Sequence, residues 1–246
     1  MNFDSYVQAF QNLYLEAIAQ PEPKFPSLEA TFGFKPARKI LIIAPHPDDE
    51  CLMSGLALRA AAEWGSTVGV LPFSYGSKVE RQVERKIELQ SALKVLGFLL
   101  VDFRKNTLHE LTVSELTDAV SSFDADVVIL PHSNDGHATH VRCSKLAREV
   151  LEVFARSEKR TVHLFESEFW QSMQNPNLLI PLSSETVIQM GRALLCHVGE
   201  VERNPYHLTL PAWLMDQVRR GSEIKKGSAK KNAVFGQLYR HEVLRA

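Results

Sequence analysis

The chain has 246 residues, of which 45% are hydrophobic and 23% are charged, as in ordinary globular proteins with one large domain. The formal net charge of −1 argues against a protein that binds nucleic acid through an overall positive field. We expect no membrane span, because no apolar run approaches the ~20 residues that a span needs. The first residues do not resemble a secretory signal and the three cysteines show no CxxC spacing, so a reduced, cytoplasmic protein is expected.

Strand-like and helix-like stretches alternate along the chain. Short apolar, β-branched runs predict five strands, at 39–45, 67–73, 98–103, 126–132 and 161–167. Helical patterns are expected at 1–20, 50–64, 79–96, 112–122, 138–156 and 183–195. Gly97 is typical of a helix C-terminus, and Thr112 with Glu115 has the spacing of a capping box.

This alternation predicts an α/β fold. We expect a Rossmann-like three-layer sandwich with a mostly parallel five-stranded sheet in the order 3-2-1-4-5. The pattern weakens after about residue 200, which indicates an irregular C-terminal extension over 200–246. We expect this extension to pack on a core of about 38–200, so that 1–246 is a single domain.

One imidazole and three carboxylates directly follow the first predicted strand, in His46, Asp48, Asp49 and Glu50. Helix capping explains one or two acids at such a place, because carboxylates are favoured at a helix N-terminus. It does not explain three acids beside a histidine, since neighbouring carboxylates repel one another unless a positive charge lies among them. The segment therefore predicts a divalent cation.

Three histidines follow the fourth predicted strand, at His132, His137 and His140. A solvated polar loop explains any one of them, but three of the nine histidines of the chain in one loop favour a ligand site. In the predicted strand order, strands one and four are neighbours, and doubly wound sheets bind ligands at this switch point. We therefore expect the two polar segments to face each other across one crevice.

The ligand count of these two segments indicates a catalytic metal. His46, Asp49 and His140 supply two imidazoles and one carboxylate, and three protein ligands with an open position are typical of catalytic zinc. Water in the open position becomes acidic enough to react near neutral pH. Asp48 is then the candidate base for that water. His137 is the candidate for stabilising an oxyanion.

At this point the residues resemble a known family. The first segment is similar to the AHPDDE-type signature of the LmbE-like (PIG-L-type) zinc-dependent N-acetylglucosaminyl deacetylases, with His46, Asp48 and Asp49 at its key positions. The second segment resembles that family's HPDH signature, with His137 and His140 on its two histidines. The resemblance implies the same ligands and roles, Zn²⁺ as the cofactor (with Fe²⁺ as a substitute), and an N-acetylated amino sugar as the substrate. Relatives often form oligomers, so a homo-oligomer is left open.

Four more residues enter through the resemblance or through departures from it. An R-x-x-E-L segment in the helix at 79–96 is similar to the family's and implies that Arg85 contacts substrate; the alternative is an ordinary surface arginine. Thr139 stands where the signature has aspartate, so another carboxylate, for which Asp135 is the candidate, would have to set the pKa of the neighbouring histidine. Glu50 is expected to support the metal ligands or the backbone of their loop.

Four of the five remaining histidines and the three tryptophans are expected to be structural or exposed. Stacking on a sugar is the alternative interpretation of the tryptophans. These residues are His109, His163, His197 and His241, with Trp64, Trp170 and Trp213.

Three alternative functions were compared with the sequence. Non-haem iron oxygenases use two histidines and one carboxylate, but usually on all-β scaffolds. A nucleotide-binding Rossmann module needs a G-x-G-x-x-G run after its first strand, which this sequence lacks. A catalytically idle carbohydrate-binding or scaffold protein is supported by Thr139 alone. We therefore predict a metal-dependent enzyme that hydrolyses the N-acetyl group of an amino sugar.

Overall fold

A seven-stranded sheet forms the centre of the structure. The computed structural model describes residues 2–18, 25–33, 37–102, 104, 108–221 and 233–245. In space the strands follow the order β3-β2-β1-β4-β5-β7-β6, and the first five are parallel to one another. The strands are β1 (Lys39–Ala44), β2 (Thr67–Pro72), β3 (Leu99–Leu100), β4 (Val127–Pro131), β5 (Val162–Ser167), β6 (Leu178–Leu182) and β7 (Phe235–Leu244).

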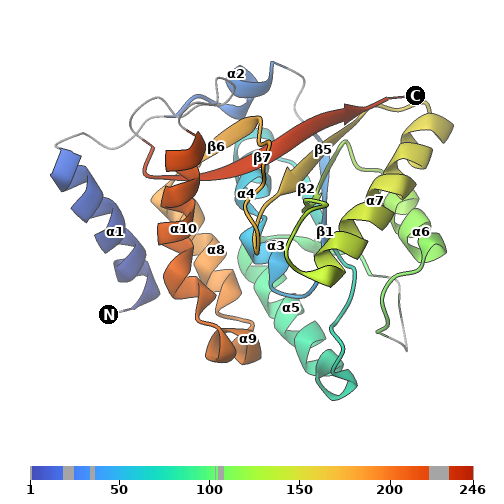
Figure 1. The fold of residues 1–246 in the computed structure, drawn as a ribbon, viewed down its shortest axis with the longest axis horizontal. Coiled ribbons are helices and arrows are strands. Elements are labelled where there is room, and N and C mark those ends of the chain that lie inside the picture. Colours follow the sequence, from blue (N-terminus) through green and yellow to red (C-terminus); the bar gives the residue numbers. More distant parts are fainter. Residues whose placement is uncertain are drawn as a thin grey trace.

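Helices cover both faces of this sheet, as Figure 1 shows. Leu41 and Ile43 of β1 belong to the core under α6 and α7, whereas Ile40 and Ile42 belong to the core on the opposite face. Both faces of β1 are therefore buried, which is why its sequence is continuously apolar. The helices are α1 (Phe3–Ile18), α2 (Leu28–Phe32), α3 (Asp49–Leu52), α4 (Gly55–Trp64), the 3-10 turn η1 (Val79–Arg81), α5 (Gln82–Leu96), α6 (Val113–Phe123), α7 (Ala138–Ser157), α8 (Ser184–Leu194), α9 (Val198–Arg203) and α10 (Tyr206–Gly221).

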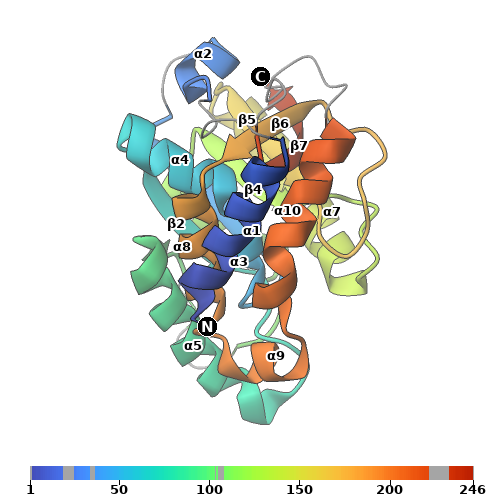
Figure 2. The same ribbon diagram turned by 90° about the vertical axis from the view of Figure 1, so that its left-hand side faces the viewer.

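The layer of helices on the face of the sheet opposite α6 and α7 is the larger of the two layers. Its central helix is α8, which contacts α1, α5 and α10 (Figure 2). The α/β three-layer architecture that the sequence predicts is thus confirmed. Among the described residues, no helix combines the length and the apolar composition that a membrane crossing requires.

Local sequence signals set several helix ends as expected. Gly97 ends α5 with φ +74°, a conformation that glycine adopts without steric cost, and its N–H donates to Leu93 O. Thr112 and Glu115 form the reciprocal capping box that opens α6.

The predictions for the sheet and for the end of the chain are partly wrong. The order 3-2-1-4-5 is correct for the first five strands, but β7 and β6 extend the sheet with two antiparallel pairings. Residues 200–246 are not irregular, since they hold most of α9, all of α10 and β7, although 222–232 lie outside the described residues. The first half of β7 is buried on both faces and includes Gly236 and Gln237, so it has neither the alternation nor the apolar run that would indicate a strand.

Two predicted elements differ in extent. The helix expected at 50–64 is divided at Met53 and Ser54 into α3 and α4. The strand expected at 98–103 pairs with β2 only at Leu99 and Leu100, and Phe103 lies outside the described residues. β3 is an edge strand of the sheet, and a short edge strand leaves few unpaired backbone groups for association with another chain.

Candidate active site

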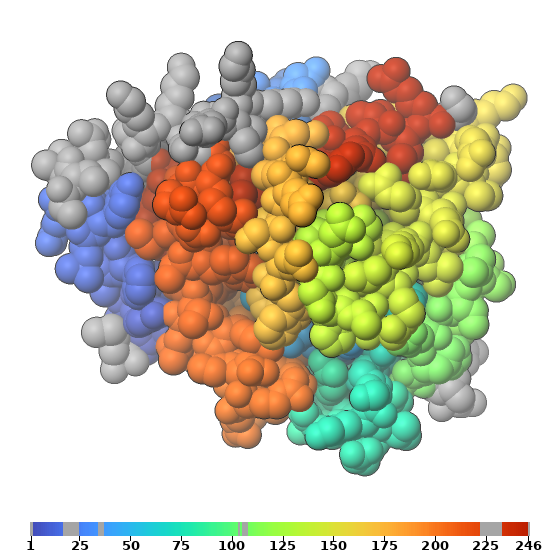
Figure 3. Space-filling view, viewed as in Figure 1, coloured from blue at the N-terminus to red at the C-terminus, as the bar shows by residue number. Residues whose placement is uncertain are grey.

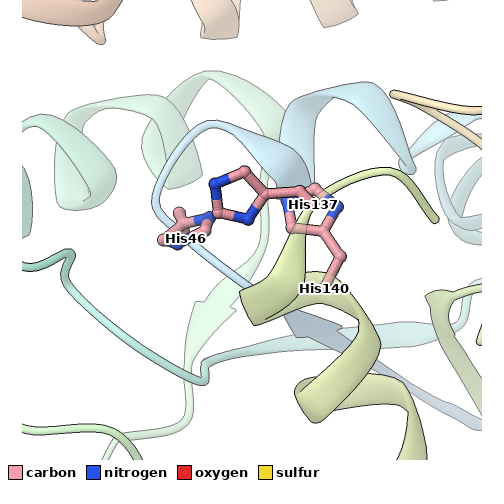
Figure 4. Close-up of side chains that lie close together, drawn as sticks. All are labelled: His46, His137 and His140. Carbon is pink, nitrogen blue, oxygen red and sulfur yellow. The ribbon is translucent and has the colours of Figure 1, made fainter.

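The candidate site lies where β1 and β4 end. These strands are paired neighbours, with Ile42 opposite Ile129. The loop after β1 carries His46, whereas His137 is the N-cap of α7 and His140 lies in its first turn. The imidazole of His46 lies 5.0 Å from that of His137 and 5.4 Å from that of His140, measured between ring centroids. The structure therefore brings the two polar segments together, and Figure 4 shows the three rings close to one another.

Asp49 lies between two of these rings. Its Oδ2 atom is 3.4 Å from His46 Nδ1 and 3.3 Å from His140 Nε2. An ion with tetrahedral bonds of about 2.0–2.2 Å keeps its ligand atoms roughly 3.3–3.6 Å apart. The His46 amide also donates to Asp49 Oδ2 at 2.9 Å, which fixes the carboxylate. The spacing of these three side chains thus fits a divalent metal.

His140 supports the same interpretation. Its side chain is buried, and neither ring nitrogen makes a hydrogen bond of acceptable geometry with any residue that the structure describes, although Asp49 and Asp135 lie 3.3 Å away. Burial opposes protonation, but the carboxylates of Asp49 and Asp135 raise the pKa of His140 to about 10. A metal ion at Nε2 would replace the proton that faces Asp49, whereas the proton on Nδ1 would remain directed at Asp135. The donor set therefore fits a cation that the two carboxylates attract.

His137 is held differently, as an N-cap of its own helix. Its Nδ1 accepts a hydrogen bond from the Thr139 amide at 3.3 Å, and its own amide donates to Asp135 Oδ1 at 2.8 Å. Burial, reinforced by His46 and His140, lowers the pKa of His137 below its ordinary value. A neutral ring that accepts at Nδ1 carries its proton on Nε2, so His137 is a hydrogen-bond donor at that atom.

Asp48 has an unusual backbone conformation. Its φ is +117°, in a region that residues other than glycine rarely adopt. Burial and the adjacent Asp49 carboxylate raise the pKa of Asp48 well above its ordinary value, while His197 and Arg85 oppose the shift. The Asp48 amide donates to Glu50 Oε2 at 2.8 Å, so Glu50 supports the loop backbone.

Arg85 reaches the same loop from α5. Its Nη2 donates to Pro47 O at 2.9 Å and lies 3.9 Å from Asp48 Oδ1. Gly76 makes room for this side chain, since a Cβ there would stand 2.5 Å from Arg85 Nη1. The Thr139 hydroxyl accepts a hydrogen bond from Arg142 Nη2 at 3.2 Å.

A cavity of about 370 Å³ opens over these residues. Its lining also includes four residues outside the two polar segments, namely Trp170, Glu200, Arg203 and Tyr206. Figure 3 shows the segments near residues 80, 140, 170 and 200 meeting on one face of the molecule. These residues belong to no motif, and aromatic character was the one signal that indicated Trp170.

His132 and His197 take other places. His132, the third histidine of its segment, bonds to Gln171 O at 2.8 Å and holds the segment after β5. His197, expected to be structural or exposed, is fully buried and contacts Glu50. The ligand atoms of His46, His137 and His140 all lie within 4.8 Å of one another, and those of Glu50, Cys51 and His197 form another such group, which hydrogen bonds join.

A comparison with known protein families finds the family that the two polar segments resemble. Residues 41–151 match the family described as PIG-L: GlcNAc-PI de-N-acetylase. This range contains every residue of the two polar segments, so the resemblance to this family that the sequence indicates is confirmed over that region.

Solved structures share the fold at low identity. N,N'-diacetylchitobiose deacetylase from Pyrococcus horikoshii has a TM-score of 0.62 at 17% identity, covering 96% of this chain and 92% of its own. The conserved protein TT1542 from Thermus thermophilus has a TM-score of 0.62 at 20% identity, covering 84% and 95%. GalB, the 4-carboxy-2-hydroxymuconate hydratase from Pseudomonas putida, has a TM-score of 0.63 at 18% identity, covering 83% and 95%.

Proposed function

We propose that this protein is a metal-dependent N-deacetylase that hydrolyses the N-acetyl group of N-acetylglucosamine or a related amino sugar. The match of residues 41–151 to the PIG-L family and the similarity to a diacetylchitobiose deacetylase support this reaction class. The observation that carries the proposal is the position of Asp49 Oδ2, 3.4 Å and 3.3 Å from two imidazole nitrogens and beside the Asp48 carboxylate.

His46, Asp49 and His140 would hold the metal. Two imidazoles and one carboxylate suit Zn²⁺, and Fe²⁺ accepts the same set. When bound, such an ion supplies a Lewis acid that polarises the amide carbonyl and acidifies water. The Asp135 carboxylate, 3.3 Å from His140 Nδ1, orients this ligand from the side away from Asp49.

The remaining residues have separate roles in hydrolysis. Asp48 accepts the proton of the attacking water and donates it to the leaving amine. His137 donates from Nε2 to the oxygen on which negative charge develops. Arg85 holds the loop at Pro47 and lines the cavity, where it meets the sugar.

We infer that residues 1–246 act as one domain. Glu200, Arg203 and Tyr206 line the same cavity as His46, although they lie beyond the region that matches the family. Residues after 200 therefore contribute to substrate binding, and are not an independent unit.

Metal analysis combined with an amine-release assay tests the proposal. The substrate panel contains N-acetylglucosamine, N,N'-diacetylchitobiose and N-acetylglucosaminyl-phosphatidylinositol. We expect about one zinc or iron ion per chain and metal-dependent amine release from at least one of these compounds. Bound metal without release from any of them would contradict the deacetylase and favour the idle sugar-binding protein. A chain that binds no metal would contradict the ligand assignment.

A further inference from the structure

A buried pair of side chains lies directly beside the candidate catalytic loop. His197 Nε2 donates to Glu50 Oε1 at 2.7 Å, and neither side chain has any exposed surface. Glu50 belongs to the first turn of α3, whereas His197 stands between α8 and α9. Buried pairs of this kind contribute little net stability, because desolvation offsets their attraction. The pair therefore calls for an explanation other than packing.

The second oxygen of Glu50 leads to Asp48. Glu50 Oε2 accepts the Asp48 amide at 2.8 Å, and Asp48 has the positive φ of +117°. Such a conformation costs about 1–3 kcal/mol and persists only where neighbouring groups hold it. The bond from Glu50 holds the amide of the strained residue itself, so the orientation of the Glu50 carboxylate and the conformation of Asp48 are linked.

The orientation of Glu50 depends in turn on His197. Oε1 accepts from the His197 ring and, more weakly, from Cys51 Sγ at 3.2 Å. A thiol is a weak donor, so the imidazole is the group that fixes this oxygen. Without it, a buried carboxylate would lack its main partner and would turn away from the Asp48 amide to find another.

His197 is itself firmly held by the backbone of the α8–α9 turn. Its amide donates to Leu194 O at 3.0 Å, and its carbonyl accepts from the Glu200 amide at 3.0 Å. In the part of the chain that the structure describes, its Nδ1 has no hydrogen-bond partner. The ring is therefore directed at Glu50 alone, and the turn that carries it also carries the cavity residue Glu200.

We propose that His197 is a positioning residue for the proposed reaction: through Glu50 it holds the Asp48 backbone so that the Asp48 carboxylate faces the substrate. The inference rests on the proposed function only where it names the reaction. The link from His197 through Glu50 to the Asp48 amide is a property of the fold, and hydrogen exchange measures it without any substrate.

Three variants separate positioning from general stability. His197→Leu keeps much of the side-chain volume but removes the donor, whereas His197→Gln keeps an N–H donor. Gln217→Ala is the matched control, because Gln217 is also fully buried and bonds to the Leu238 amide, outside the cavity lining. The measurements are amide exchange over residues 46–52, metal content, and kcat and KM on the best substrate of the panel.

For His197→Leu we expect kcat to fall about 10- to 100-fold, with KM changed less than about twofold and metal retained. Amides at 48–51 should exchange at least about tenfold faster than in the unaltered protein. His197→Gln should restore most of both properties, and Gln217→Ala should alter neither. Should His197→Leu not fold, His197→Asn, whose shorter amide falls short of Glu50, is expected to show the same changes.

Normal exchange over 46–52 in His197→Leu would overturn the proposal, as would a loss of kcat no larger than in Gln217→Ala. If the unaltered protein releases no amine from any substrate, the proposed function fails. The exchange result then still decides whether His197 positions Asp48.

Discussion

Asp48 combines a strained backbone with the role of the proposed base, and asparagine can replace it without changing its shape. Asparagine tolerates positive φ better than most residues. We therefore expect Asp48→Asn to keep its metal and to lose about 10²- to 10⁴-fold in kcat, because the amide cannot accept the proton. Metal analysis and steady-state kinetics check this, with the exposed Asp118→Asn on α6 as the control. Near-normal turnover with metal bound would show that Asp48 is not the base.

Asp102 links the loops that follow β2 and β3. Its side chain has no exposed surface and accepts bonds from Arg104 Nε at 2.9 Å and Tyr75 Oη at 2.8 Å. Burial alone would raise the pKa of Asp102, but Arg104 and Tyr75 lower it below the ordinary value. Its stabilising effect is therefore complete above the unfolded pKa of about 3.9 and is lost as the pH falls through the lower folded value.

We accordingly expect Asp102→Asn to lose about 1–3 kcal/mol of unfolding free energy at pH 7. The deficit should shrink as the pH falls below about 4, because the unaltered protein then loses the same interaction. Calorimetry between pH 3 and pH 7 measures both effects. Asp216→Asn weakens the pairs with Arg219 and Arg220 on the surface of α10 and should cost less than about 1 kcal/mol. A deficit that stayed constant across this pH range would contradict the assigned pKa.

At the scale of elements, β7 is hydrogen-bonded to the junction of α3 and α4, which follows the loop of candidate site residues after β1. Gln237 Nε2 donates to Leu52 O at 2.5 Å, and its Oε1 accepts the Gly55 amide at 3.1 Å. Gly55 allows this approach, since a Cβ there would lie 2.5 Å from Gln237 Oε1. One side chain thus joins the end of α3 to the start of α4.

We expect Gln237→Ala to cost about 2–4 kcal/mol, because two buried backbone groups lose their partners. Urea unfolding gives the value, and Gln189→Ala, on the half-buried surface of α8, should cost less than about 1 kcal/mol. Equal losses in the two variants would mean that the bonds of Gln237 do not stabilise the junction.

The segment after β5 supplies an aromatic side chain to the cavity. Trp170 is 48% exposed and meets Phe169 and Tyr206 edge-on, with ring centroids 4.7 Å and 5.5 Å away. An apolar face fixed in this way suits the ring of a sugar. We expect Trp170→Ala to raise KM about 3- to 10-fold and to leave kcat within about twofold, since only binding is lost. Val153→Ala, an exposed apolar position on α7, should change neither constant. A loss confined to kcat would rule out stacking.

At the scale of the whole molecule, the proposed metal would join segments that are far apart in the sequence. His46 follows β1, whereas His140 lies in α7, and the unfolded chain cannot hold both around one ion. Adding Zn²⁺ to chelator-treated protein should therefore raise Tm. The free energy of unfolding should rise by about 2.7 kcal/mol at a metal concentration 100 times Kd. Thermal unfolding with and without Zn²⁺ tests this. His140→Ala should bind less metal and show a smaller rise, and an undiminished rise in that variant would contradict His140 as a ligand.

Much of the core could be predicted from the sequence, because each signal is local. The continuous apolar run of β1 reports burial on both faces, and Gly97 and Thr112 report helix ends. The strand order then followed from the alternation of strands and helices. The two polar segments were found because their residues are dense in the sequence, and the neighbouring positions of β1 and β4 bring them together.

Other features were decided by the tertiary structure, because they depend on contacts between distant residues. β7 is a strand through pairing with β5 and β6, which compensates for the glycine and glutamine in its sequence. Asp48 adopts positive φ in a loop where Glu50 holds its amide, and Glu50 depends on His197, which is 147 positions away. The sequence by itself determined the layered sheet and the two polar segments that we propose to hold a metal. Folding alone determined which distant side chains hold the Asp48 loop and line the cavity, since no local pattern reports those contacts.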